Sequence, residues 1–123
     1  MELRDKVIVI TGGSGGIGRA MAQAFLREGA KGICLADLNE TTTKQAALEL
    51  DPSGEQCVGM QCDVTSESDI KSLADATKEK FGPIDLFCSN AGAGAGGLLT
   101  EAENAIWQKQ WELHVMSHLY AAR

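Results

Sequence analysis

The sequence predicts an α/β fold, a doubly wound parallel sheet whose helices cover both faces. Three observations predict it. Short apolar runs alternate with segments of helical periodicity, a glycine-rich loop joins the first run to the first helix, and an aspartate ends the second run. Strands that alternate with helices form right-handed crossover units, and such units build parallel sheets.

Four apolar runs are expected to be strands. Their apolar and β-branched residues follow one another without polar alternation, which is typical of strands that are buried on both faces. The runs are bounded by glycine, proline or other turn residues. They lie at residues 6–11, 32–37, 56–61 and 84–89.

Apolar residues at helical spacing follow each expected strand. In the first helix they are Ile17, Ala20, Met21, Ala24 and Phe25. Either Asn39 or Thr41 can cap the second helix, and Ser66 with Asp69 three residues later resembles a capping box for the third. The four helices are expected to run from about Ile17 to Gly29, from Asn39 or Thr41 to about Leu50, from Thr65 to Gly82, and from about Glu103 to Arg123.

Length and composition agree with one globular domain. The chain has 123 residues, of which 44% are apolar and 23% charged. The net charge of −6 argues against nucleic acid as a partner, and no apolar run approaches the roughly 20 residues of a membrane helix. The charged start shows no secretory signal, so we expect a cytoplasmic protein. The four cysteines are expected to be buried, reduced thiols rather than metal ligands or disulfides: Cys34, Cys57, Cys62 and Cys88.

The glycine-rich loop predicts a phosphate site. Residues 13–18 read G-S-G-G-I-G, which matches G-x-G-x-x-G between a strand and a helix. Glycine allows a tight turn and lets a diphosphate approach the backbone, where the positive end of the helix binds the anion. Ser14 can add a hydroxyl donor. The alternative is a glycine turn that merely joins strand to helix.

Asp37 strengthens the phosphate interpretation. It ends the second strand, 19 residues after Gly18, where an acid can accept hydrogen bonds from the adenosine ribose. A carboxylate also repels a 2′-phosphate, which favours NAD over NADP. No Lys or Arg follows Asp37 before Lys44, although Arg19 remains a candidate contact for a 2′-phosphate.

The motifs now described resemble those of the short-chain dehydrogenase/reductase family. Residues 11–18 read T-G-G-S-G-G-I-G, residues 63–64 read D-V, and residues 90–92 read N-A-G, each after the expected strand. The resemblance implies a Rossmann-like sheet and hydride transfer between a nicotinamide and an alcohol or carbonyl carbon. It makes residues 1–123 the N-terminal part of an NAD(P)-binding domain that acts on a small molecule and forms homo-oligomers.

The resemblance also assigns cofactor contacts. It implies that Asp37 binds the adenosine ribose, and that three further sets of residues bind the diphosphate, the adenine and the nicotinamide ribose. The diphosphate group is Gly12, Ser14, Gly15, Ile17 and Gly18. The adenine residues are Asp63 and Val64, and the nicotinamide-ribose residues are Asn90, Ala91 and Gly92. From the residues alone, 90–92 could equally be a turn.

The catalytic residues depart from the family pattern. The family uses an Asn, a Ser and Tyr-x-x-x-Lys, whereas the only tyrosine here is Tyr120 and no lysine follows it. Seven residues after Trp107, where the family has its Asn, stands His114, which can act catalytically or only pack locally. We therefore expect a doubly wound sheet truncated after the fourth strand and the next helix, either as part of a longer NAD-dependent enzyme or as an inactive binding piece or partner subunit.

The last helix carries Trp107, Trp111, Val115 and either His118 or Leu119 on one face. This stripe is predicted to serve as core or interface rather than as a ligand contact. Two other nucleotide-dependent classes fit less well. The patterns T-G-G-S-G-G-I-G at 11–18 and N-A-G at 90–92 argue against a methyltransferase. A P-loop nucleotidase would need Gly-Lys-Ser/Thr after the glycine loop, and this sequence has none there.

Overall fold

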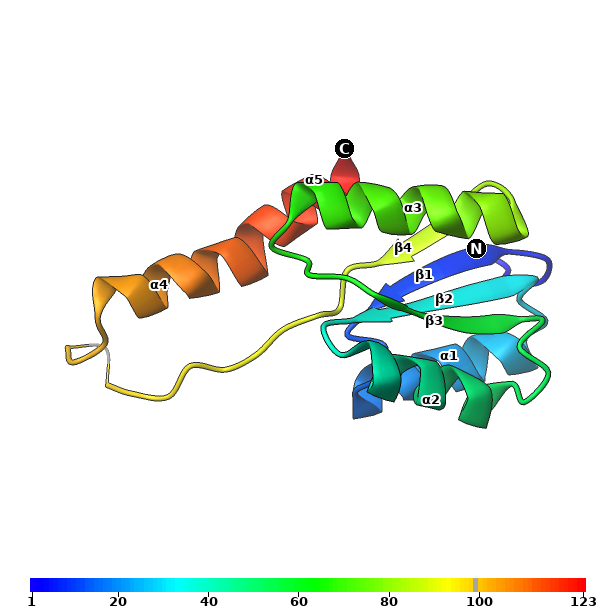
Figure 1. Cartoon of the computed structure of the whole chain (residues 1–123), viewed down its shortest axis with the longest axis horizontal. Coiled ribbons are helices and arrows are strands. Elements are labelled where there is room, and N and C mark those ends of the chain that lie inside the picture. Colours follow the sequence, from blue (N-terminus) through cyan, green and yellow to red (C-terminus); the bar gives the residue numbers. More distant parts are fainter. Residues whose placement is uncertain (99) are drawn as a thin grey trace.

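The computed structural model describes residues 1–98 and 100–123 and confirms the α/β fold (Figure 1). The sheet has four parallel strands in the order β3-β2-β1-β4. The strands are β1 (Val7–Thr11), β2 (Gly32–Asp37), β3 (Cys57–Gln61) and β4 (Leu86–Cys88). The helices are α1 (Gly16–Arg27), α2 (Glu40–Leu50), α3 (Glu67–Phe81), α4 (Asn104–Trp111), the π-helical segment η1 (Glu112–Met116) and α5 (Ser117–Ala122).

The core has two layers because both faces of the sheet are covered. All five residues of β1 are buried, and their side chains alternate between the faces. Ile8 and Ile10 pack with Ala22 of α1 and Ala46 of α2 on one face. Val9 packs with residues of α3 on the other face, and partly buried residues of the last helical region join that layer. The uninterrupted apolar run that predicted the strand thus reflects burial on both sides.

The predicted core face of α1 is partly wrong. Ile17 is exposed, as are Ala20 and Ala24, while Gly18 and Ala22 are buried. The helix is rotated so that Gly18 lies against the backbone of the glycine loop. This close approach directs Ile17 away from the core and toward the cavity described below.

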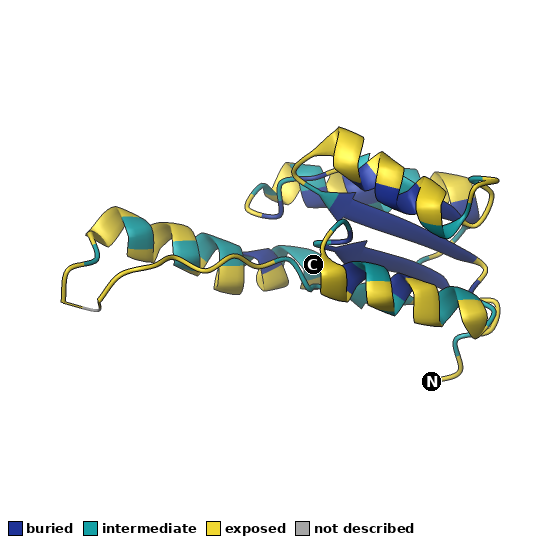
Figure 2. Ribbon diagram, turned by 90° about the horizontal axis from the view of Figure 1, so that it is seen from below, coloured by how far each residue is buried: buried dark blue, intermediate teal, exposed yellow. Residues whose placement is uncertain are grey.

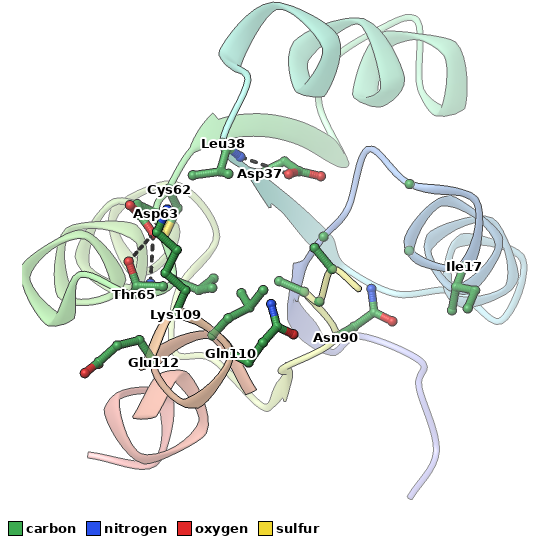
Figure 3. Close-up of a pocket in the computed structure, with 18 of the residues that line it drawn as sticks. Ile17, Asp37, Leu38, Cys62, Asp63, Thr65, Asn90, Lys109, Gln110 and Glu112 are labelled. Atoms are coloured by element: carbon green, nitrogen blue, oxygen red, sulfur yellow. Dashed lines mark hydrogen bonds between the residues drawn. The ribbon is translucent and has the colours of Figure 1, made fainter. Parts of the chain in front are cut away.

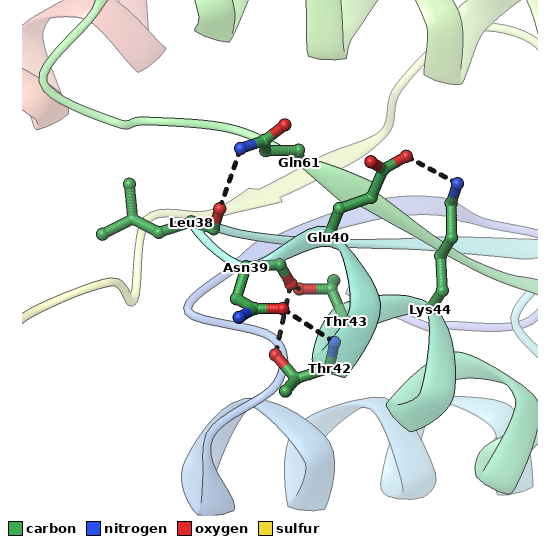
Figure 4. Close-up of polar contacts among 7 residues, drawn as sticks. All are labelled: Leu38, Asn39, Glu40, Thr42, Thr43, Lys44 and Gln61. Atoms are coloured by element: carbon green, nitrogen blue, oxygen red, sulfur yellow. Dashed lines mark hydrogen bonds and ion pairs between the residues drawn. The ribbon is translucent and has the colours of Figure 1, made fainter.

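The start of α2 settles which residue caps it (Figure 4). The Asn39 side chain accepts a hydrogen bond from the Thr42 amide at 3.0 Å, and the helix begins at Glu40. Asn39, rather than Thr41, is therefore the cap. At α3, Ser66 accepts from the Asp69 amide as predicted, but the Asp69 carboxylate reaches back to the Asp63 amide instead of the Ser66 amide. The capping pair therefore also fixes the turn that follows β3.

The last helix differs from the predicted regular α-helix. It is interrupted by η1, and its first part extends away from the sheet (Figures 1 and 2). The stripe residues are exposed rather than core: Trp107 49%, Trp111 54%, Val115 41% and Leu119 42%. The fourth strand is also shorter than predicted, with three residues paired to β1 at the edge of the sheet.

All four cysteines are free, and three of them are buried. Burial raises the pKa of the Cys34 thiol to about 11 and that of Cys57 to about 12, so both thiols are protonated near neutral pH. The expected burial is confirmed for Cys34, Cys57 and Cys62, whereas Cys88 on the edge strand is half-buried. Within the part of the chain that the structure describes, no helix is both long and apolar enough to span a bilayer.

Candidate functional site

A cavity of about 930 Å³ opens at the carboxyl ends of the strands (Figure 3). In open parallel sheets, ligands bind at this end, where successive connections leave toward opposite sides. Ten residues predicted from the sequence line the cavity: Gly12, Gly15, Ile17, Gly18, Asp37, Asp63, Val64, Asn90, Ala91 and Gly92. Gly12 and Gly92, which are 80 positions apart in the chain, therefore lie at one site.

The glycine loop is compact because Gly12 and Gly18 have no room for a Cβ atom. A Cβ on Gly18 would lie 2.3 Å from the Gly12 carbonyl oxygen, and one on Gly12 would lie 2.9 Å from the Ala91 Cα. Gly12 also has a φ of +65°, which favours glycine. The loop thus holds the backbone of Gly12 close to both α1 and the segment after β4.

The amino end of α1 is available to an anion. Its N-cap is Gly15, which provides no side-chain hydrogen bond, and its first turn has no acidic residue. In contrast, Asn39 caps α2 and Ser66 caps α3, each with an acidic residue in the first turn. The free amide groups and positive dipole end at α1 suit a phosphate.

Asp37 and Ser14 form one unit at the end of β2. The Ser14 hydroxyl donates to Asp37 Oδ2 at 2.5 Å, and the Ser14 amide donates to the same oxygen at 3.2 Å. The Leu38 amide donates to Oδ1. Ser14 does not line the cavity as expected; its hydroxyl orients the acid instead. The carboxylate is thereby fixed at the cavity wall in a defined direction.

Asp63 has a similar support after β3. Its Oδ1 accepts hydrogen bonds from the Thr65 amide at 2.9 Å and the Thr65 hydroxyl at 2.7 Å, while its own amide donates to Asp69. Among the described residues, none donates to Asp63 Oδ2. This oxygen can accept a hydrogen bond from a ligand in the cavity, which Asp63 and Val64 both line.

Thr11 connects the two loops of the site. The Thr11 hydroxyl accepts from the Asn90 amide at 3.0 Å and from the Ala91 amide at 3.1 Å, and the Asn90 side-chain nitrogen donates to the Thr11 carbonyl at 2.9 Å. Thr11 itself is buried. Thr11, at the end of β1, therefore holds residues 90–93 in place after β4, and these residues form what we call the floor of the cavity.

His114 contacts this floor from η1. Its Nε2 lies 3.0 Å from the Ala93 carbonyl oxygen, which can only accept, so the ring donates from Nε2. The ring also lies against Gly92, where a Cβ would come within 2.9 Å of its Cε1 atom. His114 does not itself line the cavity, but it holds two residues that do.

Sequence reasoning missed several lining residues. Leu38 and Thr65 adjoin predicted positions and could have been inferred from them, whereas the residues of α4 and η1 carry no motif. Those residues are Gln108, Lys109, Gln110, Glu112 and Leu113. Within residues 1–98 and 100–123, no group of three or more His, Cys, Asp or Glu side chains is arranged to hold a metal ion.

The comparisons with known proteins agree with this geometry. The family model described as short chain dehydrogenase matches residues 6–123. The chain belongs to the short-chain dehydrogenase family. This assignment confirms the resemblance carried by the two glycine loops, and the cavity is the part of the short-chain dehydrogenase fold where these loops meet.

The chain matches only part of the length of each curated relative. The chain is 36% identical to Short chain aldehyde dehydrogenase 1 of Euphorbia lathyris, covering 99% of this chain and 42% of that protein. It is 40% identical over 92 residues to Zerumbone synthase of Zingiber zerumbet, covering 75% and 34%. The chain thus spans between about a third and a half of the length of the curated relatives that it matches.

Solved structures show the same fold. A short-chain dehydrogenase/reductase from Burkholderia phymatum, in complex with NAD, superposes with a TM-score of 0.92 at 35% identity, covering 100% of this chain and 43% of that one. A Brucella melitensis short-chain dehydrogenase/reductase also gives 0.92, at 29% identity, with 99% and 51% covered. The tight glycine cradle and the uncapped amino end of α1 have the form that the diphosphate of a dinucleotide such as NAD requires.

Proposed function

We propose that the protein is an NAD-dependent oxidoreductase that transfers a hydride between the nicotinamide and an alcohol or carbonyl carbon. Residues 1–123 carry the cofactor-binding half. The observation that carries the proposal is the meeting of the glycine loop, two oriented carboxylates and residues 90–92 in one cavity. The dehydrogenase names of relatives and the NAD complex of one solved neighbour support it.

The choice of NAD over NADP rests on the surroundings of two charged residues, Asp37 and Arg19. Ser14 and Leu38 fix the Asp37 carboxylate at the cavity wall, where it would repel a 2′-phosphate. Arg19, the candidate cation for that phosphate, is paired with Glu49 of α2 and does not line the cavity. The Arg19 guanidinium beside Glu49 lowers the pKa of that exposed carboxyl, which keeps the pair charged.

Replacing Asp37 with asparagine is expected to lower the affinity for NAD about ten-fold, because a charge-assisted contact to the ribose is lost. The affinity for NADP should stay constant or increase, since the repelling charge is gone. Calorimetric titration of both dinucleotides measures the ratio. Asp75→Asn on α3 is the matched control, outside the cavity, and should change neither affinity. An unchanged NAD to NADP ratio in Asp37→Asn contradicts the assignment.

The alternative is an inactive dinucleotide-binding piece or a partner subunit. It is favoured by His114, which stands at the position where the family has its catalytic Asn. The two are separated by mixing the chain with NADH and carbonyl substrates and following the absorbance of the reduced nicotinamide. Sustained turnover supports an active enzyme, and binding without turnover supports the alternative. No heat of binding with NAD would contradict both.

We also propose that His114 acts at the nicotinamide end, as a positioning residue that holds Gly92 and Ala93. His114→Ala is expected to weaken NADH binding about five-fold, the loss of one hydrogen bond, and to leave ADP binding unchanged. The difference between the two ligands matters, because general loosening of the fold would weaken both. His114→Asn, which restores a side-chain donor, should recover part of the NADH affinity. Equal losses for NADH and ADP contradict the role.

The exposed apolar stripe supports a homo-oligomer in which stripes of two chains pack together. Trp111→Glu places a charge in the stripe and should shift the sedimentation coefficient toward that of a monomer. Leu48→Glu is the matched control, because Leu48 is equally exposed, at 55%, but lies on α2. Sedimentation velocity at several concentrations measures the change. If both variants sediment alike, the stripe is not the interface.

The four free thiols support a reducing compartment, and we propose the cytoplasm. Fractionation of cells that express the full-length protein, followed by immunodetection, tests this. Recovery from an oxidising compartment contradicts it.

A further inference from the structure

The wall that α4 adds to the cavity contains a cation. Lys109 is the only Lys or Arg among the described residues that line it, whereas three lining residues are acidic: Asp37, Asp63 and Glu112. Figure 3 shows Lys109 on the same side of the cavity as Asp63 and Thr65, opposite the helix that carries Ile17. The charged side chains of the lining are thus one cation and three acids, and the other lining residues are uncharged.

Five of the eleven Lys and Arg side chains form ion pairs, and Lys109 is not one of them. Arg19, Lys44 and Lys78 each lie within ion-pair distance of an acid on the surface, and Lys6 pairs with Asp85. Among the described residues, no carboxylate lies within 4 Å of the Lys109 ammonium group, although acids line the same cavity. Its charge is therefore not neutralised by a direct pair.

The glycine-loop side of the cavity has no side-chain cation. Its donors are backbone amides at the start of α1, and Arg19 is held by Glu49 outside the cavity. A dinucleotide brings two negative phosphates into a lining that already has more acids than bases. An ammonium group in the same space offsets this repulsion, and lysine binds phosphate as a mobile point charge.

We propose that Lys109 is a further cofactor-binding residue, which contacts a phosphate of the bound dinucleotide from α4. The inference rests on the proposed function, since it assumes a dinucleotide in this cavity. It gives the segment 104–116 a role in ligand affinity as well as in packing. Lys109 would recognise a phosphate ester attached to adenosine. Its contribution to the affinity therefore depends on the charge of the ligand.

The test compares Lys109→Gln with the unchanged chain for three ligands: NAD, ADP and adenosine. At low salt, Lys109→Gln is expected to weaken NAD and ADP about ten-fold, because a hydrogen bond to a charged group is lost. Adenosine, which has no phosphate, should bind equally to both. High salt should reduce the difference, because ions screen an exposed charge. Lys109→Arg should bind within about two-fold of the unchanged chain.

Lys71→Gln on α3 is the matched control, with the same change in net charge at an exposed position outside this cavity. If Lys109→Gln and Lys71→Gln bind ADP alike, the inference is wrong while the proposed function stands. An equal loss for adenosine and ADP also overturns it, since Lys109 would then shape the pocket without recognising phosphate. If the unchanged chain binds neither NAD nor ADP, the proposed function fails and this inference fails with it.

Discussion

Gly18→Ala is expected to destabilise the chain by about 3 kcal/mol and to weaken NAD binding at least ten-fold. The added Cβ would lie 2.3 Å from the Gly12 carbonyl oxygen and 2.8 Å from the Gly13 Cα. Both atoms are backbone and cannot rotate away as the end of a side chain can. The loop or the helix must therefore move, and the phosphate cradle opens with it. Urea unfolding and calorimetry with NAD measure the two effects.

Gly16→Ala is the matched control for this glycine. A Cβ at Gly16 would meet no atom within 4 Å, and the residue begins α1 with ordinary helical geometry. Alanine is the better helix former by about 1 kcal/mol in a helix interior, so Gly16→Ala should unfold at the same or a higher urea concentration. Equal stability of Gly18→Ala and Gly16→Ala would show that the contact between α1 and the loop is not tight.

Thr11→Val has the second large effect, a loss of about 3 kcal/mol. Valine has nearly the shape of threonine, so packing in the fully buried site is preserved. It cannot accept the hydrogen bonds from the Asn90 and Ala91 amides, which are 3.0 and 3.1 Å from the hydroxyl. An unsatisfied buried donor costs about 1–3 kcal/mol. The segment after β4 should detach first, and hydrogen exchange at those two amides reports it.

Two further variants define the cause. Thr11→Ser keeps the hydroxyl and should retain most of the stability. Thr43→Val removes a different buried hydroxyl, one that donates to the Asn39 carbonyl, and this oxygen still accepts from the Thr43 amide. Its loss should be about 1 kcal/mol or less. If Thr43→Val costs as much as Thr11→Val, burial rather than the bridge between the loops determines the effect.

The sheet and the phosphate loop were predictable because local patterns determine them. The run K-V-I-V-I-T can be satisfied only by burial on both faces, and the bounds predicted for β2 agree with the structure. A short polar side chain before a helix also predicted the cap Ser66, and it narrowed the cap of α2 to Asn39 or Thr41, of which the structure uses Asn39. The core face of α1 does not follow from its apolar spacing, because it depends on the tertiary contact between Gly18 and the glycine loop.

The contribution of the last helix was not predictable. The apolar spacing of this segment predicts a helix. It does not predict the π-helical turn or the place of the helix beside the cavity, because both depend on tertiary contacts. Lys109 and Glu112 therefore look like ordinary surface charges in the sequence, although both line the site. Ser14 shows the reverse case, since the motif placed it at the diphosphate while its hydroxyl orients Asp37. A motif specifies which residues gather, and the fold specifies what each one contacts.

The uncapped amino end of α1 has a consequence for how stability is measured. The other two long helices, α2 and α3, begin after Asn39 and Ser66, whose side chains cap them, whereas α1 begins after Gly15, which offers no side-chain cap. An anion that binds there completes the helix, so its concentration enters the folding equilibrium by mass action. With a nucleotide bound there as proposed, the melting temperature rises with the nucleotide concentration, and a dialysed sample melts at a lower temperature than a sample that contains the nucleotide.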